Sequence, residues 1–464
     1  AETRTDAYII NTYYYPTSKS LGQNAIGMVL LMNRFTQKNM TQYKMQLIAT
    51  SKSNLSMATT PVLLEITPHD NCLMLTVFAT LQLLPDTNFI AMVSRVNMTI
   101  IPFKTPSYQK RNVVVCISPL YVTEQWQNFL LVVHIYKKFG AHMHLYFISA
   151  VTSFFELMWE YQKHVGLSPW DRMMFPFVPG DIADAYSQVE FQNLAAAQTD
   201  CLLQYKESAQ YVALFELSDI LIPKLAPTFI KEFQILLERS KGTKDVAYFE
   251  YQKHHYEATV YNHTIFRIED MIRSLVNMEK KTLGNIVIIP EKLNYTWMDR
   301  PFSLPGGLRS ITVEDNEIIH LANISWVLRF GIEENPRNIS NHTEFSRSLE
   351  FQNISISEIE SNMKSMFENE RIAEILPNLP NFYYFYDMLK ECFEGRYYRI
   401  LRNRRNRLKN GICPGPQICS FVQNDAVKCV HVNAKHFYMH EIRPVTYYFA
   451  TNYFYSADIG CYPH

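Results

Sequence analysis

The chain has 464 residues, of which 47% are hydrophobic and 14% aromatic. This length is enough for two or three folded domains, and this composition argues against extensive disorder. Its 44 basic and 44 acidic residues cancel, so no net field draws the protein to nucleic acid or to an anionic membrane. We therefore expect a folded protein without a nucleic-acid partner.

The density of Asn-x-Ser/Thr sequons indicates a glycoprotein of the secretory pathway. Chance would give roughly three or four in a chain of this length and ordinary composition. The sequence holds nine, at Asn39, Asn54, Asn97, Asn262, Asn294, Asn323, Asn338, Asn341 and Asn353. We therefore expect N-glycosylation and an oxidising compartment.

The eight cysteines fit that compartment, because an even number in an oxidising lumen is typical of disulfides, although the pairing stays open. Five of them crowd the last quarter of the chain, where CPGPQIC, residues 413–419, has the spacing of a disulfide loop. Cys116 and Cys201 lie in apolar runs, where two buried free thiols are the alternative to a bridge.

No apolar run approaches the ~18 residues that a membrane-spanning helix needs. The sequence opens on the polar stretch AETRTD. We therefore expect a lumenal fragment whose targeting segment is missing, so that any membrane contact would come through an N-terminal anchor absent from this sequence.

Residues 1–108 carry short β-branched and aromatic runs separated by Gly, Pro, Asn and Ser. They include AYIINTYYY, NAIGMVLLMN and CLMLTVFATLQLL. Short strands at such spacing are typical of a β-sandwich. We predict an all-β, sandwich-like N-terminal domain without visible chemistry of its own.

Strands and helices alternate from residue 109 to about 335. NVVVCISPL predicts a buried parallel strand, followed by a helix that Thr123 caps at its start and Gly140 ends. A strand at 142–149 precedes a helix with a capping box formed by Ser153 and Glu156.

A third strand in MMFPFVP, a helix at 186–205 and a strand in YVALFE complete the alternation. This order predicts an α/β domain built around a parallel sheet.

Polar residues stand at the carboxyl ends of two of these strands. Ser118–Tyr121 follow the first strand and Glu216–Asp219 follow the last, so both groups should line one crevice. Glu216, Ser218 and Asp219 offer hard oxygen ligands, which suit Mg²⁺ or Mn²⁺. The alternative is a strand that runs into a polar turn. His320 is a single histidine in an apolar run, which is more typical of a core residue than of a ligand.

Residues 336–464 form a cysteine-containing C-terminal region. Its basic run, RYYRILRNRRNRLKN, is typical of a solvated helix face rather than a nucleic-acid site. Aromatic residues near its end either help to bind an acceptor glycan or pack the tail onto the preceding domain.

Taken together, VVVCISPLYVTEQWQNFLLVVHIYKKFGAHMHLYFIS, FQNLAAAQTDCLLQY and YVALFELSDILIP resemble the glycosyltransferase family 92 domain. The similarity covers about residues 110–325, and the order of the motifs is more specific than any one of them. The resemblance implies a GT-A fold, a UDP-sugar donor, a divalent metal, inverting transfer and type II anchoring in the Golgi. It also implies a specificity: galactose from UDP-galactose, moved onto the core α1,6-fucose of N-glycans.

The family's acidic motif reads Asp-x-Asp followed by Asp or Glu, and this chain departs from it. Glu216 and Ser218 stand at the two Asp positions, and Asp219 is the acid that follows. The resemblance then implies Mn²⁺ or Mg²⁺ held by Glu216, Asp219 and His320. Ser218 is a poor metal ligand, so a catalytically impaired protein is the alternative.

The resemblance also implies contacts to the donor and a general base. We expect the donor contacts at Ser118, Pro119, Leu120, Tyr121, Glu124, Gln192, Gln198, Glu216 and Ser218. Candidates for the base are Glu257, Glu269 and Asp270, because FRIEDMI is similar to the acid pair of many inverting GT-A enzymes. The alternative is that Glu269 and Asp270 form an exposed helical face.

Two other function classes compete with a transferase. A secreted carbohydrate-binding protein would account for the sandwich, sequons and disulfides, but not for the acid-ended strand. An inverting glycoside hydrolase would use two carboxylates but would need neither metal nor nucleotide.

Overall fold

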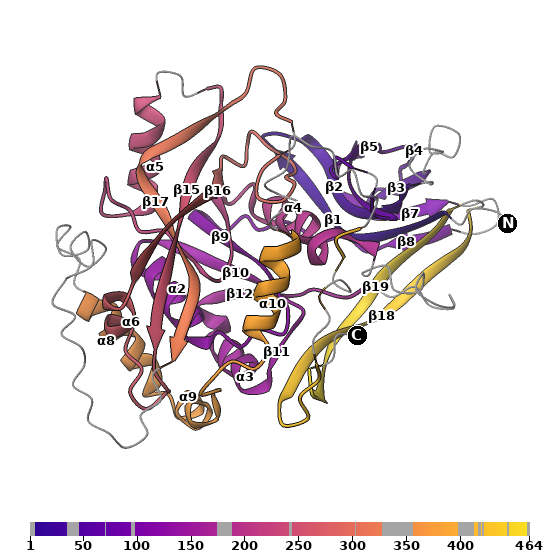
Figure 1. Ribbon diagram of the computed structural model, residues 1–464. Helices are drawn as coiled ribbons and strands as arrows, with labels where there is room; N and C mark the ends of the chain where they lie inside the picture. The colour runs from indigo at the N-terminus through magenta and orange to yellow at the C-terminus, as the bar shows by residue number, and fades with distance from the viewer. Residues whose placement is uncertain are drawn as a thin grey trace, which may run out of the picture.

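The computed structural model confirms the α/β class, with helices packed around three β-sheets (Figure 1). The residues it describes are 5–34, 46–69, 71–93, 98–173, 188–240, 244–301, 303–326, 356–397, 413–415, 419, 422–442 and 445–461. Within these ranges, no helix combines the length and apolarity needed to cross a bilayer.

The central sheet has eight strands in the order β12-β10-β9-β13-β16-β15-β17-β14. The first four run parallel to one another, as in a nucleotide-binding half-sheet. They are β12 (Val165–Pro169), β10 (Ala141–Phe147), β9 (Arg111–Leu120) and β13 (Ala209–Phe215). The other four are β16 (Val276–Ile288), β15 (Val246–Val260), β17 (Arg309–Trp326) and β14 (Asp219–Ile220).

Helices cover both faces of this sheet, which explains the continuous apolar run in the middle of β9. Val113, Val115 and Ile117 of β9 belong to one core with α2 (Trp126–Lys138) and α5 (Phe229–Arg239). The alternate residues of β9 belong to a second core with α4 (Leu194–Tyr205). Both sets of side chains are therefore buried.

Two predicted helix starts are wrong, and one predicted end is confirmed. α2 begins at Trp126 after Gln125, so Thr123 does not cap it. α3 (Thr152–Glu160) begins before Ser153, which therefore cannot form the expected capping box. Gly140 has φ +83°, and its N–H donates to the carbonyl of Lys137, as expected beyond a helix end.

The third parallel strand is not the predicted one. β12 takes that place in the sheet, whereas MMFPFVP lies almost entirely outside the described residues. β12 holds Gly, Ser and Pro, and so lacks the β-branched run that marks β9.

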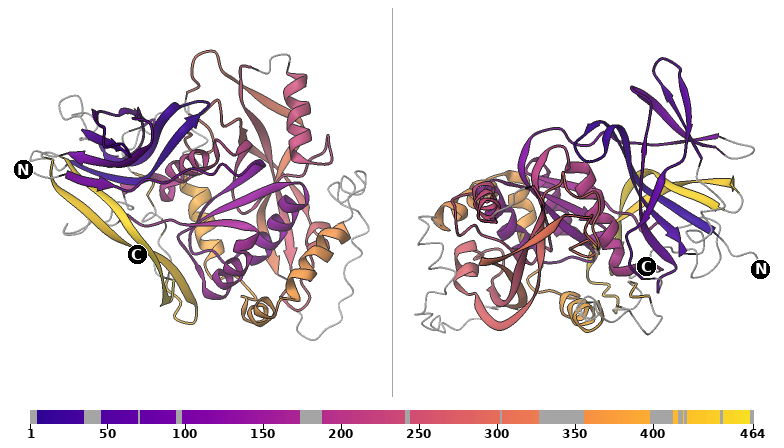
Figure 2. Two further views of the ribbon diagram at one scale, coloured as in Figure 1. Left: turned by 180° about the vertical axis from the view of Figure 1, so that it is seen from behind. Right: turned by 90° about the horizontal axis from the view of Figure 1, so that it is seen from above.

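The N-terminal strands form two sheets that pack around a third core (Figure 2). The smaller sheet has the order β4-β3-β7-β8. Its strands are β4 (Ser56–Thr59), β3 (Leu47–Ser51), β7 (Thr87–Val93) and β8 (Met98–Ile101).

The larger sheet has the order β11-β18-β19-β1-β2-β6-β5. Its strands are β11 (Ser149–Val151), β18 (Lys428–Ile442), β19 (Val445–Ile459), β1 (Thr5–Ser18), β2 (Gly22–Asn33), β6 (Met74–Gln82) and β5 (Val62–Glu65). Two of its strands come from the C-terminal region. The predicted division at 108 and 335 therefore separates strands that share a sheet, and it stays a prediction.

The remaining helices bring the C-terminal region onto the central domain. α6 (Ile268–Arg273) and α8 (Ile356–Phe367) pack together, and α9 (Glu370–Ile375) packs on α3. α10 (Tyr386–Cys392) lies in front of the parallel strands in Figure 1. The basic run lies mostly outside the described residues.

All eight cysteines form disulfides, as the secretory composition predicted. The pairs are Cys72–Cys413, Cys116–Cys201, Cys392–Cys419 and Cys429–Cys461. The expected CPGPQIC loop is wrong, because its two cysteines pair elsewhere. The first ties the tail to the N-terminal sheets, and the second ties it to the end of α10.

Candidate active site

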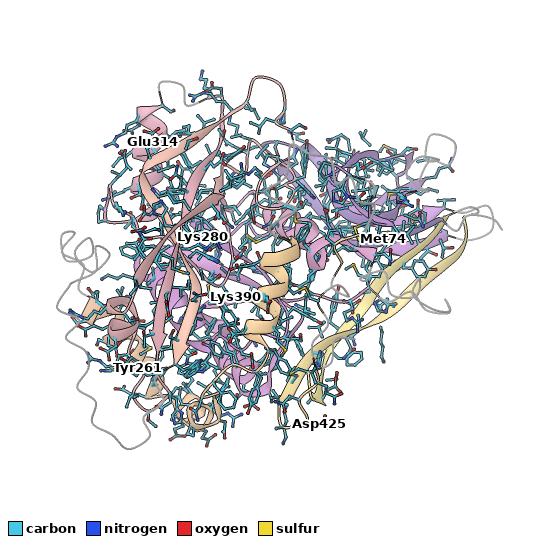
Figure 3. All side chains as sticks on the ribbon, in the orientation of Figure 1. Met74, Tyr261, Lys280, Glu314, Lys390 and Asp425 are labelled. Atoms are coloured by element: carbon cyan, nitrogen blue, oxygen red, sulfur yellow. A yellow bond between two sulfur atoms is a disulfide. The ribbon has the colours of Figure 1, made fainter. Side chains whose placement is uncertain are left out.

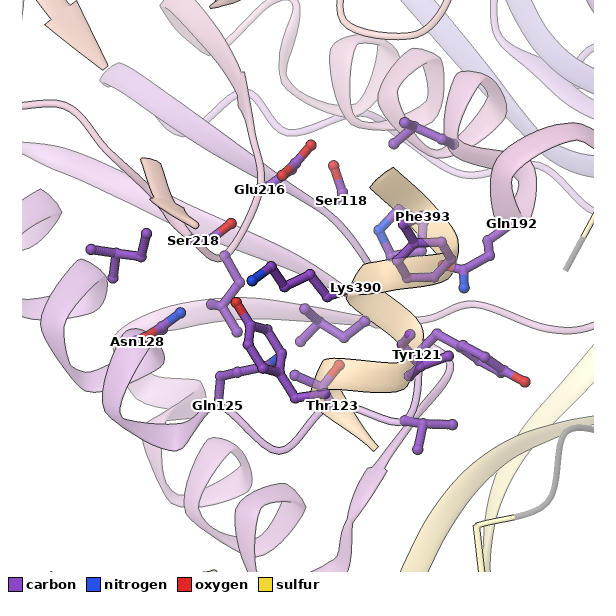
Figure 4. Close-up of a pocket in the computed structure, with 18 of the residues that line it drawn as sticks. Ser118, Tyr121, Thr123, Gln125, Asn128, Gln192, Glu216, Ser218, Lys390 and Phe393 are labelled. Carbon is purple, nitrogen blue, oxygen red and sulfur yellow. The ribbon is translucent and has the colours of Figure 1, made fainter. Parts of the chain in front are cut away.

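A pocket opens at the carboxyl ends of β9 and β13 (Figure 4). The two strand ends are joined there by the Ser118 hydroxyl, which donates to the carbonyl of Phe215 over 3.3 Å. Seven of the nine predicted donor contacts line this pocket, namely Ser118, Pro119, Leu120, Tyr121, Gln192, Glu216 and Ser218, and Glu216 is also a predicted metal ligand. Their roles in binding a donor stay predictions.

The three predicted metal ligands lie together beside this pocket. β14 pairs antiparallel with β17, which places Asp219 directly opposite His320. The distance from His320 Nδ1 to Asp219 Oδ1 is 2.7 Å, and to Glu216 Oε2 it is 3.9 Å. One ligand atom from each of the three residues lies within 4.8 Å of the others.

Asp219 is fully buried, and both oxygens of its carboxylate have hydrogen-bond partners. The backbone N–H of Glu216 donates to Oδ2 over 2.9 Å, which closes the turn after β13. Burial alone would raise the pKa of Asp219, but the nearby Lys253 ammonium and the hydrogen bond with His320 outweigh it and lower that pKa. The carboxylate is therefore ionised at neutral pH.

Lys253 is a functional residue that sequence reasoning missed. Its buried Nζ lies 3.1 Å from Asp219 Oδ2 and 3.7 Å from Glu216 Oε1. Burial alone would lower the pKa of Lys253, but the charges of Asp219 and Glu216 outweigh burial and raise that pKa above its usual value. The ammonium therefore stays charged. One ammonium therefore faces two carboxyl groups. Little in the sequence signals this role, because β15 also holds Gln252, His254 and His255 around the lysine, so one more polar residue does not stand out.

The cluster fits a hard divalent cation. Two of its three donors are carboxylates, which suit Mn²⁺ and Mg²⁺, and an imidazole completes the set. Ser218 faces the same histidine, with its Oγ 3.4 Å from His320 Nδ1. Glu216, Asp219 and His320 are therefore the residues that would hold the ion.

Asp299 is a second residue that the sequence analysis missed. It lines the pocket from the loop between β16 and β17. Burial raises the pKa of its carboxyl to about 6. The Lys253 ammonium acts to lower this pKa, and the charge of Glu216 acts to raise it. Gln198, a predicted donor contact, instead holds Asp299 by two bonds. Its Nε2 donates to Asp299 Oδ1 over 2.6 Å, and its Oε1 accepts the Asp299 N–H over 2.9 Å.

Glu124, another predicted donor contact, lies behind the pocket wall and is fully buried. Its carboxylate accepts the backbone N–H groups of Tyr384, Phe385 and Tyr386, at the start of α10. Burial raises the pKa of Glu124 to about 7, against the effect of these hydrogen bonds. The structure therefore places Glu124 as the anchor of α10.

α10 forms one wall of the pocket with Tyr386, Leu389 and Lys390, and Phe393 and Glu394 follow it (Figures 3 and 4). Lys390 also donates to the side chain of Asn323 on β17. The C-terminal region thus shares the pocket with the strand-end acids. No pattern in the sequence signals this, because α10 lies more than 150 residues from β13 along the chain.

The three predicted candidates for the base do not line the pocket. Glu257 on β15 accepts a hydrogen bond from Ser325. Glu269 on α6 forms ion pairs with Arg267 and Arg273, and Asp270 lies 3.8 Å from Arg267. Their catalytic role stays an untested prediction.

Two buried amide groups in the pocket have no hydrogen-bond partner among the described residues. They are Asn128 Oδ1, an acceptor, and Gln192 Nε2, a donor. Gln192 lies in a left-handed segment before α4, with φ values of +47°, +58° and +60° at Phe191, Gln192 and Asn193. Strained backbone and unsatisfied polar atoms are typical of a site that binds a polar ligand.

The model of glycosyltransferase family 92 matches residues 111–367. A glycosyltransferase family 92 protein of Caenorhabditis elegans is 42% identical over 478 residues, covering 100% of this chain and 92% of the relative. Another from the same organism is 31% identical, covering 98% of this chain and 90% of the relative. Among solved structures, S. aureus TarS in complex with UDP is 8% identical, covers 47% of this chain and 61% of its own, and has a TM-score of 0.23.

Proposed function

The chain belongs to glycosyltransferase family 92, and we propose that it is an inverting, metal-dependent UDP-sugar transferase with a GT-A type catalytic domain. The proposed reaction moves galactose from UDP-galactose onto a glycan hydroxyl, that of the core fucose of N-glycans. The observation that carries the proposal is the Glu216, Asp219 and His320 cluster, set beside a pocket at the carboxyl ends of parallel strands.

Sugar transfer requires, first, that the negative charge on the leaving diphosphate be stabilised. A divalent ion, when bound, neutralises the diphosphate that departs from the sugar. Glu216, Asp219 and His320 would hold the ion, and Lys253 keeps the Asp219 carboxylate ionised while no ion is present. The free donor and acceptor groups of Gln192 and Asn128 would bind polar atoms of the nucleotide sugar.

The second demand is a carboxylate that receives the proton of the attacking hydroxyl. One displacement at the anomeric carbon inverts its configuration, with a sugar hydroxyl in place of the water that a hydrolase uses. The carboxylate must reach the pocket, which Glu257, Glu269 and Asp270 do not do in this structure.

The proposed location is the Golgi lumen, with the chain N-glycosylated and anchored as a type II membrane protein. The sequon density and the four disulfides support a lumenal protein. Expression in a secretory host, with mass mapping of occupied sequons, would test this part of the proposal.

A catalytically impaired, carbohydrate-binding protein on the same fold is the second candidate. Ser218 in the acidic motif favours it, and so does Lys253, which already supplies a positive charge to the two acids. Such a protein would bind a glycan without turning over a nucleotide sugar.

A donor screen with purified protein and Mn²⁺ separates the two candidates. Thermal shift and UDP release are measured with UDP-galactose, UDP-glucose, UDP-N-acetylglucosamine and UDP-N-acetylgalactosamine, each with and without a core-fucosylated glycan. We expect stabilisation and acceptor-dependent UDP release with UDP-galactose. Glycan binding without release of UDP from any donor would favour the impaired protein.

A further inference from the structure

The loop that carries Asp299 is built to present one side chain. Trp297 and Arg300 exchange backbone hydrogen bonds, each of 3.1 Å, around a two-residue turn. The two residues of the turn, Met298 and Asp299, have φ values of +45° and +72°. Both lie in the left-handed region that such turns require, which Gly, Asn and Asp adopt most easily.

The side chains around this turn fix its orientation. Arg300 pairs with Glu250 of β15 over 2.5 Å on one side, and Gln198 of α4 makes its two bonds to Asp299 on the other. Met298 is buried although methionine is costly at positive φ. Strain held by the surroundings in this way is a feature of functional sites.

The Asp299 carboxyl has one oxygen to spare. Oδ1 accepts from Gln198, and no described side chain donates to Oδ2. The other two pocket carboxylates are committed, since Glu216 belongs to the acid cluster and Glu394 pairs with Lys280 over 3.6 Å. Asp299 is therefore the pocket carboxylate available to a substrate hydroxyl.

We propose that Asp299 is the general base of the transfer reaction, an inference that rests on the proposed function. Asp299 Oδ2 takes the proton of the acceptor hydroxyl as the acceptor oxygen bonds to the anomeric carbon. The bond from that carbon to the diphosphate oxygen breaks, and its electron pair leaves with UDP. The proton on Asp299 then passes to water, which restores the carboxylate.

Electrostatics around Asp299 agree with this role. Lys253 on β15 favours the ionised form, whereas burial and the charges of Glu216 and Asp219 disfavour it. The result is a carboxylate more basic than an exposed aspartate yet mostly ionised at neutral pH. The proposal itself depends on the turn, the free oxygen and the position in the pocket.

The test replaces four carboxylates by their amides, one at a time: Asp299→Asn, Glu257→Gln, Glu269→Gln and Asp270→Asn. We measure kcat and KM for the donor by UDP release, and UDP affinity by calorimetry, with Mn²⁺ present. For Asp299→Asn, kcat should fall at least ~100-fold while the UDP affinity stays within about threefold of wild type. Asp299→Glu, which keeps a carboxylate, should recover part of the loss, and the other three variants should keep wild-type kcat.

Unchanged kcat in Asp299→Asn would overturn the proposal, and so would a loss of UDP affinity that matches the loss of turnover. If Asp299→Asn does not fold, Gln198→Leu serves instead, because it removes the bond that orients the carboxyl but leaves the carboxyl in place. Its kcat should fall with UDP affinity retained, and an unchanged kcat would again count against Asp299. A wild-type protein that turns over no donor would instead overturn the proposed function, and this proposal with it.

Discussion

Two groups of acids in this protein look alike in the sequence and differ in the structure. Glu269 and Asp270 stand in the first turn of α6, paired with Arg267 and Arg273 on a partly exposed surface. There they interact favourably with the helix dipole and with an arginine one turn along. Glu216 and Asp219 stand at the end of β13, where Asp219 has no exposed surface and faces a buried lysine and a histidine.

The two groups of acids differ in how far their charges are already compensated by solvent and by neighbouring basic groups. Solvent and arginines already satisfy the α6 acids, so a ligand would gain little there. The two strand-end acids are largely shielded from solvent and share a single ammonium, so a cation gains from binding there. Burial with incomplete charge compensation, rather than adjacency in the sequence, marks the site.

Removal of divalent ions should have the largest effect. Dialysis of the full chain against EDTA should abolish acceptor-dependent UDP release, and among common divalent ions Mn²⁺ should restore it best. The measurement is turnover against the concentration of each ion. Full activity in chelator would show that Lys253 alone supplies the positive charge, and would refute the metal requirement.

Asp219→Asn should follow, with a loss of at least ~100-fold in kcat, because an oxygen ligand of the ion loses its charge. The variant also leaves the Lys253 ammonium with less compensation in a buried position, so thermal stability is measured beside activity. Asp219→Asn combined with Lys253→Met separates the two effects, since it should regain stability without regaining turnover. Wild-type turnover in either variant would show that Asp219 is not a ligand.

The sequence was sufficient for the parts of the site that depend on local pattern. β9 and β13 are apolar runs with polar ends, and the rule for parallel sheets brings those ends together. Asp219 and His320 could be paired only through the family resemblance, because the pairing of β14 with β17 joins residues 101 apart in the chain.

The rest could not be predicted, because it depends on contacts between distant segments. Asp299 sits in a turn that lacks the usual Asn-Gly or Asp-Gly signal. Lys253 lies among the polar residues of β15, and nothing in the sequence shows that its side chain is buried. α10 is held at the pocket by contacts with distant segments, among them Glu124, which accepts N–H groups at its start. The predicted disulfide within CPGPQIC is also wrong, because each of its cysteines pairs with a cysteine that is more distant in the sequence.

Glu124→Ala should have a smaller effect than the changes at the acid cluster. It leaves three N–H groups at the start of α10 without their acceptor, a cost of about 1–3 kcal/mol in stability. Because α10 forms a wall of the pocket, UDP affinity should also fall, by ~10-fold. Calorimetry with UDP measures the second effect.

Glu232→Ala is the matched control for Glu124→Ala. Glu232 is also buried and accepts the N–H groups of Lys224 and Leu225, but it lies away from the pocket. Its loss should lower stability by a similar amount and leave UDP affinity unchanged. Equal losses of affinity in both variants would mean that α10 has no special part in binding.

Ser218→Asp restores the family's acidic motif and should have a modest effect. The new carboxylate adds a negative charge beside His320, so Mn²⁺ should bind up to ~10-fold more tightly. The measurement is the Mn²⁺ concentration that gives half-maximal turnover, with Ser218→Asn as a control of similar size without charge. Unchanged Mn²⁺ binding in the aspartate variant would show that position 218 does not face the ion.

The smallest effect should come from the α6 acids, and it tests the comparison most directly. Glu269→Gln removes the ion pairs with Arg267 and Arg273, and Asp270→Asn removes a charge from the first turn of the helix. Each change should cost only ~0.3–1 kcal/mol of stability, because these pairs are partly exposed and screened by solvent. Turnover and donor KM should stay within about twofold of wild type, because neither side chain lines the pocket. A ~100-fold loss of kcat at normal stability and UDP affinity would mean that the acceptor reaches α6, and that partly exposed, fully paired acids can serve as the base here.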